Sequence, residues 1–86
     1  MTTMLTDLTV SELAQVLFAS AVQPSDASTP ERIRAAVDER LCACGQAFCA
    51  AFVAQEAGDH PESYAARMRW ALDTVAGAYR KHLVAA

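Results

Sequence analysis

The sequence predicts an all-α protein, a small four-helix bundle-like domain. Apolar residues make up 53% of its 86 residues, and much of that fraction is alanine, the strongest helix former. Large apolar side chains recur at spacings of three and four, whereas valine, isoleucine and threonine never form an alternating run. A chain this short builds one core. We therefore expect a flexible N-terminus over residues 1–8 and a single helical domain over residues 9–84.

The first helix is predicted to run from Val10 to Ala21. Thr9 and Glu12 form a T-x-x-E capping box at its start, in which each residue binds the other's backbone N–H. Pro24 lies in the loop that follows, and proline cannot continue a helix. This loop is the only long connection we expect.

The second helix is predicted to begin at Pro30, with Ser28 or Thr29 as its cap. Proline suits the first helical position, where no backbone N–H is needed. Gly45 is predicted to end this helix in a left-handed turn, because glycine adopts that conformation without steric cost.

The third helix, from Gln46 to Ala57, is apolar on almost every side and carries only Glu56 as a charge. A helix without a polar face is usually buried. We therefore predict that the third helix is central in the fold, with Phe48 and Phe52 as its main core residues. Gly58 is predicted to end it.

The fourth helix is predicted to run from Pro61 to about Val84, with Asp59 or His60 as its cap. At 100° per residue, one side of this helix forms a core stripe of Tyr64, Met68, Ala71, Leu72, Val75, Tyr79 and Leu83. Trp70 projects from nearly the opposite side, among small residues and arginine. A large aromatic residue in that position indicates a surface for another chain.

The predicted partner-binding residues are accordingly Arg67, Trp70, Thr74 and Lys81. Trp70 would be the buried anchor and Arg67 would supply charge-assisted contacts, with Thr74 and Lys81 at the rim. A protein partner or a second copy of the chain would satisfy this surface. The alternative interpretation is that Trp70 packs over the outside of its own domain.

The three cysteines, Cys42, Cys44 and Cys49, suggest a competing function as a thiol- or metal-based sensor. Cys44 and Cys49 bracket the turn at Gly45, and His60 would complete a metal-binding set of Cys44, Cys49 and His60. The spacing matches no standard zinc site, and helical geometry points Cys42 away from Cys44. Free thiols remain the simplest interpretation, with a metal or a disulfide as alternatives.

Charge and composition argue against several other classes of protein. The net charge is −3, and the basic residues are scattered, so direct binding to nucleic acid is not expected. No segment has the length of a membrane span or the pattern of a signal peptide. We find no catalytic motif and expect no cofactor, so a non-enzymatic cytoplasmic protein is predicted.

Two stretches, LFASAVQPSDASTPERIRAAV and VAQEAGDHPESYAARMRWAL, resemble a group of small Streptomyces regulatory proteins of the aba-type and whiJ-associated gene clusters. The resemblance covers residues 8–75 or so. Genes of this group tend to neighbour one for a helix-turn-helix regulator. The resemblance therefore implies a part in development and antibiotic production, most simply through contact with that DNA-binding protein.

Overall fold

A computed structural model describes residues 8–26 and 28–79 of the chain. In this part the chain forms four α-helices and one short 3₁₀ turn, without a strand, as the sequence predicts. The α-helices are α2 (Val10–Phe18), α3 (Pro30–Cys44), α4 (Gln46–Asp59) and α5 (Pro61–Ala78), and η1 (Pro24–Asp26) lies between α2 and α3. None of these helices is long and apolar enough to cross a bilayer.

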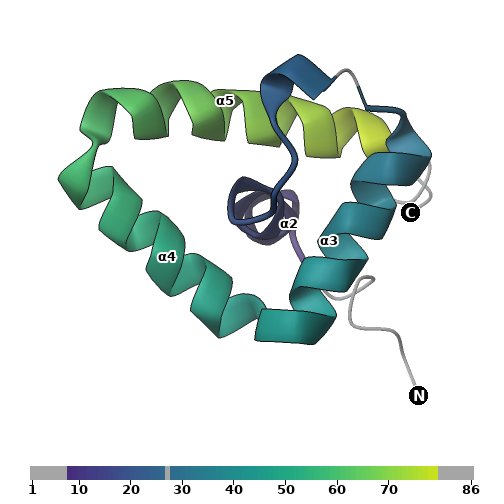
Figure 1. Cartoon of the computed structure of the whole chain (residues 1–86), viewed down its shortest axis with the longest axis horizontal. Helices are drawn as coiled ribbons and strands as arrows, with labels where there is room; N and C mark the ends of the chain where they lie inside the picture. Colours follow the sequence, from purple (N-terminus) through teal and green to yellow (C-terminus); the bar gives the residue numbers. More distant parts are fainter. Residues whose placement is uncertain (1–7, 27, 80–86) are drawn as a thin grey trace.

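The helix at the centre of the fold is α2, not α4. Figure 1 shows α2 nearly end-on, with α3, α4 and α5 arranged around it as the sides of a triangle. More than half of the residues of α2 are buried, and they lie toward its C-terminal end: Leu13, Ala14, Val16, Leu17 and Phe18. In α4 only Cys49 and Val53 are buried. The prediction of a central third helix is therefore wrong, because α2 is the helix that the other three surround and the one that makes the most extensive contacts.

The predicted N-terminal caps of α2 and α3 are confirmed. The Thr9 hydroxyl accepts from the Glu12 backbone N–H at 3.1 Å, and the Glu12 carboxylate accepts from the Thr9 N–H at 2.9 Å. Thr29, rather than Ser28, caps α3 by accepting from the Arg32 N–H at 3.2 Å. These bonds satisfy backbone donors that a helix leaves unpaired at its first turn.

The predicted C-terminus of α2 at Ala21 is too late, because this helix ends at Phe18. The Ser20 hydroxyl donates to the Leu17 carbonyl at 2.7 Å and accepts from the Val22 N–H at 3.2 Å. Such local side-chain bonds compete with the helical pattern. The chain turns away here and reaches η1, where the Asp26 carboxylate accepts from the Gln23 N–H at 2.8 Å.

Gly45 is the single residue between α3 and α4. Its φ of 85° and ψ of 160° are accessible to glycine and strained for any L-residue. The prediction that Gly45 ends the helix is thus confirmed, although its ψ differs from that of a left-handed helical cap. Gly58 does not end α4, which continues to Asp59, and His60 holds the cap position of α5 without a side-chain cap bond.

The packed side of α5 differs from the predicted stripe. Four residues on this side are buried: Ala71, Val75, Ala78 and Tyr79. All of them except Ala78 belong to the predicted stripe. Leu72, however, is 37% exposed, and Trp70 packs against the core. Ala71 is fully buried, and its small side chain permits close packing of α5 on its neighbours.

Only the N-terminal limit of the predicted domain can be compared with the described residues. Leu8, which we assigned to a flexible N-terminus, is half-buried and packs against the core. Residues 1–7, together with Lys81 and Leu83 of the predicted fourth helix, lie outside the described residues.

Candidate functional site

Arg67 reaches from α5 to the end of α2 and binds its backbone. Its Nε and Nη2 atoms donate to the Phe18 carbonyl at 3.1 and 3.0 Å. Nη2 also lies 3.3 Å from the Ser20 carbonyl and 2.9 Å from the Val22 carbonyl. These carbonyls lie at and just beyond the end of α2, where the helix no longer supplies backbone donors. The half-buried Arg67 guanidinium therefore serves as the C-terminal cap of α2. Burial lowers the pKa of Arg67.

The Trp70 ring lies against the same guanidinium, whose Cζ atom is 4.9 Å from the ring centre. This is a cation–π contact. Trp70 is half-buried and contacts the core. The expectation that Trp70 points away from the core is therefore wrong, and the alternative, in which it packs over its own domain, describes its surroundings.

The other predicted partner-binding residues are also partly occupied. Arg67 makes its hydrogen bonds within the chain, so it has few donors left for a partner. Thr74 is half-buried on α5, and Lys81 lies outside the described residues. The structure thus places Arg67 and Trp70 side by side and does not present them as a free surface.

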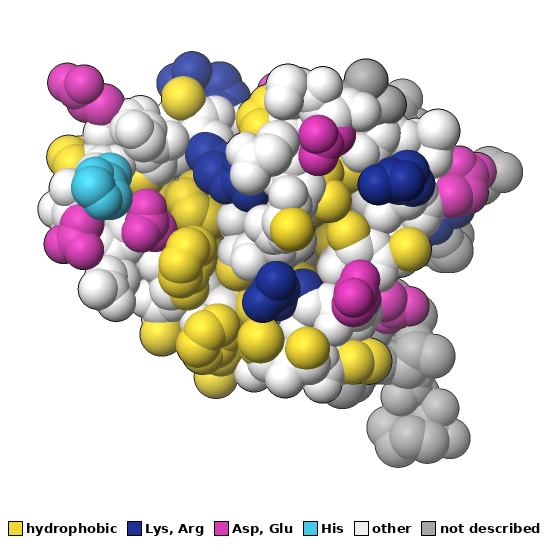
Figure 2. All heavy atoms as spheres, viewed as in Figure 1, with side chains coloured by type: hydrophobic (Ala, Val, Ile, Leu, Met, Phe, Trp, Pro, Cys, Tyr) yellow, Lys and Arg dark blue, Asp and Glu magenta, His cyan; other side chains and the backbone are white. Residues whose placement is uncertain are grey.

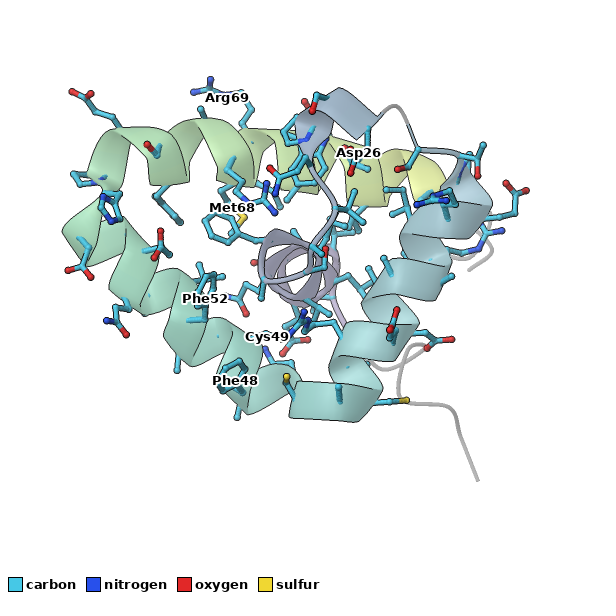
Figure 3. All side chains as sticks on the ribbon, viewed as in Figure 1. Asp26, Phe48, Cys49, Phe52, Met68 and Arg69 are labelled. Carbon is cyan, nitrogen blue, oxygen red and sulfur yellow. The ribbon has the colours of Figure 1, made fainter. Side chains whose placement is uncertain are left out.

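The most exposed large hydrophobic side chains of the described residues lie on α4 instead. Phe48 is 53% exposed and Phe52 is 39% exposed, and Figure 3 places them along one helix. We use the name α4 face for a set of exposed residues on this helix: Ala47, Phe48, Ala51, Phe52 and Ala54. Figure 2 shows hydrophobic side chains gathered over α4 and toward the middle of the molecule.

The α4 face is missing from the predicted site because we placed Phe48 and Phe52 in the core. The sequence does contain a signal for it, since a helix that is apolar all round buries only one stripe when it packs on one side. No residue from Gln46 to Gln55 is charged. The remaining apolar residues must then face the solvent or a partner.

A series of ring contacts joins the α4 face to Trp70. The Phe52 ring packs edge-on against the Phe18 ring, with 6.2 Å between centroids. The Arg67 Cζ atom lies 5.3 Å from the Phe18 ring centre and 4.9 Å from that of Trp70. Phe18 and the Arg67 guanidinium therefore connect Phe52 of α4 to Trp70, the predicted anchor on α5.

The three cysteines lie near the corner between α3 and α4 and differ in their exposure to solvent. Cys42 is exposed, Cys44 is half-buried and Cys49 is buried, and all three are free thiols. The Arg40 Nη1 atom donates to the Cys44 sulfur at 3.4 Å. Burial raises the pKa of Cys49, the charge of Cys44 raises it further, and Arg40 lowers it.

The alternative metal set of Cys44, Cys49 and His60 is not brought together in the described residues. Within residues 8–26 and 28–79, no three histidine, cysteine, aspartate or glutamate side chains are placed to hold a metal ion. His60 follows α4 while Cys44 precedes it. A helix rises about 1.5 Å per residue, so the length of α4 separates His60 from the two cysteines.

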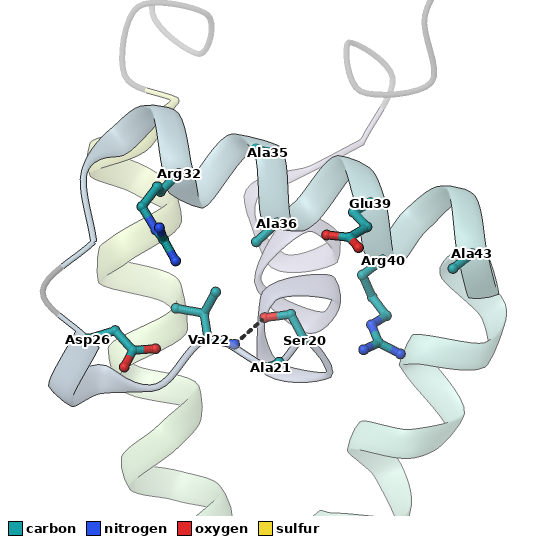
Figure 4. A pocket seen from close by; sticks show the side chains of 10 residues that line it. All are labelled: Ser20, Ala21, Val22, Asp26, Arg32, Ala35, Ala36, Glu39, Arg40 and Ala43. Atoms are coloured by element: carbon teal, nitrogen blue, oxygen red, sulfur yellow. Dashed lines mark hydrogen bonds between the residues drawn. The ribbon is translucent and has the colours of Figure 1, made fainter.

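A hollow of about 490 Å³ lies between α3 and the connection from α2 to η1. Figure 4 shows Arg32 and Arg40 directed toward it from α3, with Ala36 between them. Its charged lining consists of Arg32, Arg40, Asp26 and Glu39. Because the two positive and two negative charges balance, the hollow favours neither anions nor cations.

Comparisons with protein families, with curated proteins and with solved structures gave no match for this chain.

Proposed function

We propose that this chain is a non-enzymatic regulatory or adaptor protein that binds a protein partner through the α4 face. The observation that carries the proposal is the exposure of Phe48 and Phe52 on a stretch without charge, Gln46 to Gln55. Contiguous exposed apolar surface on a small protein marks interaction sites. Covering the exposed parts of both rings would contribute about 2–3 kcal/mol to binding.

Trp70 enters the proposal as the far end of the same aromatic network. Its exposed part, with Thr74 beside it on α5, could extend the contact beyond Phe52. Arg67 would then act by holding Phe18 and Trp70 in place. The partner-binding roles of Arg67, Trp70, Thr74 and Lys81 stay predictions.

The proposed partner is a helix-turn-helix transcription regulator acting in actinobacterial development or antibiotic production. This part of the proposal rests on the resemblance to the small Streptomyces regulatory proteins. The proposal includes a cytoplasmic location, because a bacterial transcription regulator binds DNA in the cytoplasm. A second copy of the chain is the other occupant that the α4 face would accept.

Calorimetric titration of the purified chain with a helix-turn-helix regulator of the kind encoded beside genes of the resembling group tests the proposal. Phe48→Glu should weaken binding at least tenfold, because a carboxylate would be desolvated in an apolar contact. Leu72→Glu is the matched control, since Leu72 is an exposed large hydrophobic residue on α5. It should change the Kd by less than about twofold.

Two results would contradict the proposal. Equal weakening by Phe48→Glu and Leu72→Glu would show that the α4 face is not the contact. Absence of binding by the wild-type chain would remove this partner. Circular dichroism of each variant confirms that the helices are intact, so that a loss of binding is not a loss of fold.

A further inference from the structure

The corner between α3 and α4 holds two thiols of different exposure, and one of them is hydrogen-bonded to a guanidinium. Cys44 is the last residue of α3, and Gly45 alone separates it from α4, which carries Cys49 as its fourth residue. Arg40, one turn before Cys44, donates to the Cys44 sulfur at 3.4 Å. Cys42 lies on the same helix, exposed.

We propose that Cys44 is an oxidation site for peroxides and that Cys49 closes a disulfide with it. This inference is independent of the proposed partner. It rests on the Arg40–Cys44 contact, on the partial exposure of Cys44 and on the burial of Cys49 at the same corner. Neither Cys42 nor a metal ion takes part.

Arg40 selects Cys44 as the attacking thiol. A guanidinium within hydrogen-bond distance stabilises negative charge on sulfur, and the thiolate is the form that attacks a peroxide. Cys44 is half-buried and Cys49 is buried, so a peroxide from solution reaches Cys44 more readily than Cys49. Burial and the charge of Cys44 raise the pKa of Cys49, so Cys49 is held as the neutral thiol.

The chemistry balances with the peroxide as the only oxidant. The Cys44 thiolate attacks one oxygen of hydrogen peroxide, the O–O bond breaks, and hydroxide leaves while Cys44 becomes a sulfenic acid. The Cys49 sulfur then attacks the Cys44 sulfur. The S–O bond breaks, and the departing oxygen takes the Cys49 proton to leave as water. Two thiols are oxidised to one disulfide as the peroxide is reduced.

The first step also prepares the second. Oxidation of Cys44 to a neutral sulfenic acid removes the Coulombic effect by which Cys44 raises the pKa of Cys49. Arg40, whose charge lowers the pKa of Cys49, remains in place. Cys49 therefore becomes a better nucleophile once Cys44 is oxidised.

The start of α4 permits the approach that the disulfide needs. A disulfide requires Cα atoms about 4.4–6.8 Å apart, and any adjustment toward that separation falls on the first turn of α4. Gly45 provides no side-chain cap for this turn, and the Cys49 N–H reaches the Gly45 carbonyl over 3.3 Å. An uncapped first turn with a long hydrogen bond opens at low cost.

The test treats the full chain with hydrogen peroxide in a Cys42→Ser background, which excludes bridging between exposed Cys42 thiols. Intact mass should show the loss of two hydrogen atoms per chain. Adding Cys49→Ser should leave a sulfenic acid that a dimedone probe traps, and adding Cys44→Ser should slow oxidation of the remaining thiol at least tenfold. Arg40→Met should slow the first step roughly threefold, whereas Arg32→Met, on the exposed first turn of α3, should not.

Three outcomes would overturn the inference. They are a gain of oxygen without the loss of two hydrogens, equal oxidation rates for Cys44→Ser and Cys49→Ser, and equal effects of Arg40→Met and Arg32→Met. Circular dichroism before oxidation shows that each variant is folded. Tris(2-carboxyethyl)phosphine should restore the starting mass if the product is a disulfide.

Discussion

Arg67 contacts Phe18 in two ways at once. Its Nε and Nη2 atoms bind the Phe18 carbonyl at 3.1 and 3.0 Å, and its Cζ atom lies 5.3 Å from the Phe18 ring centre. Phe18 is the last residue of the central helix and is buried. This pair therefore caps the end of α2 and ties α5 to it.

Replacing Arg67 should destabilise the fold rather than only alter its surface. Arg67→Met keeps the aliphatic stem but leaves the carbonyls of Phe18 and Val22 without their donor. We expect the free energy of unfolding to fall by about 2–3 kcal/mol, measured by urea denaturation. Arg69→Met, on the exposed side of α5, should change it by less than about 0.5 kcal/mol. Equal effects of the two substitutions would contradict a capping role for Arg67.

Trp70→Ala separates a packing role from a binding role. Trp70 packs against the core and under the Arg67 guanidinium, so its loss should lower the free energy of unfolding by about 2 kcal/mol. Light scattering on a sizing column then reports whether the folded variant still associates. Unchanged stability with loss of association would instead show that Trp70 is a free anchor.

Tyr79 should make the fold sensitive to alkaline pH. Burial and, to a smaller extent, the charge of Asp38 raise the pKa of Tyr79, and Arg34 lowers it, with a net value of about 12. In the unfolded chain tyrosine ionises near pH 10, so between about pH 10 and pH 12 the native state holds a proton that the unfolded state has lost. Stability is then constant below pH 10 and falls above it.

The size of this fall is expected to be roughly 1–2 kcal/mol. Urea denaturation at several pH values measures it, and Tyr79→Phe provides the comparison, because phenylalanine has no proton to lose. The variant should show the shallower decline with pH. Parallel declines for both proteins would contradict the assignment to Tyr79.

Local sequence signals determined most of the secondary structure. The capping box at Thr9 and Glu12, the Thr29–Pro30 start and the glycine at position 45 depend on neighbours within four residues. Such interactions act in any tertiary context. For that reason the starts of all four helices and the all-α class were predictable.

The ends of two helices were not predictable in the same way. Nothing near Phe18 in the sequence shows that Arg67, on α5, will take its carbonyl. A contact between residues so far apart along the chain exists only once the helices have packed. Gly58 is the second case. Glycine often ends a helix, but α4 continues past Gly58 to Asp59.

The sequence by itself thus determined the helices, their starts and the supply of apolar side chains. Only the tertiary structure decided which helix is central, which side of α5 packs, and that Phe48 is exposed while Trp70 is half-buried. The physical reason is that hydrophobicity has no direction. An apolar side chain is stabilised by any partner, and only the packing of α3, α4 and α5 around α2 determines which side chains find one within the chain.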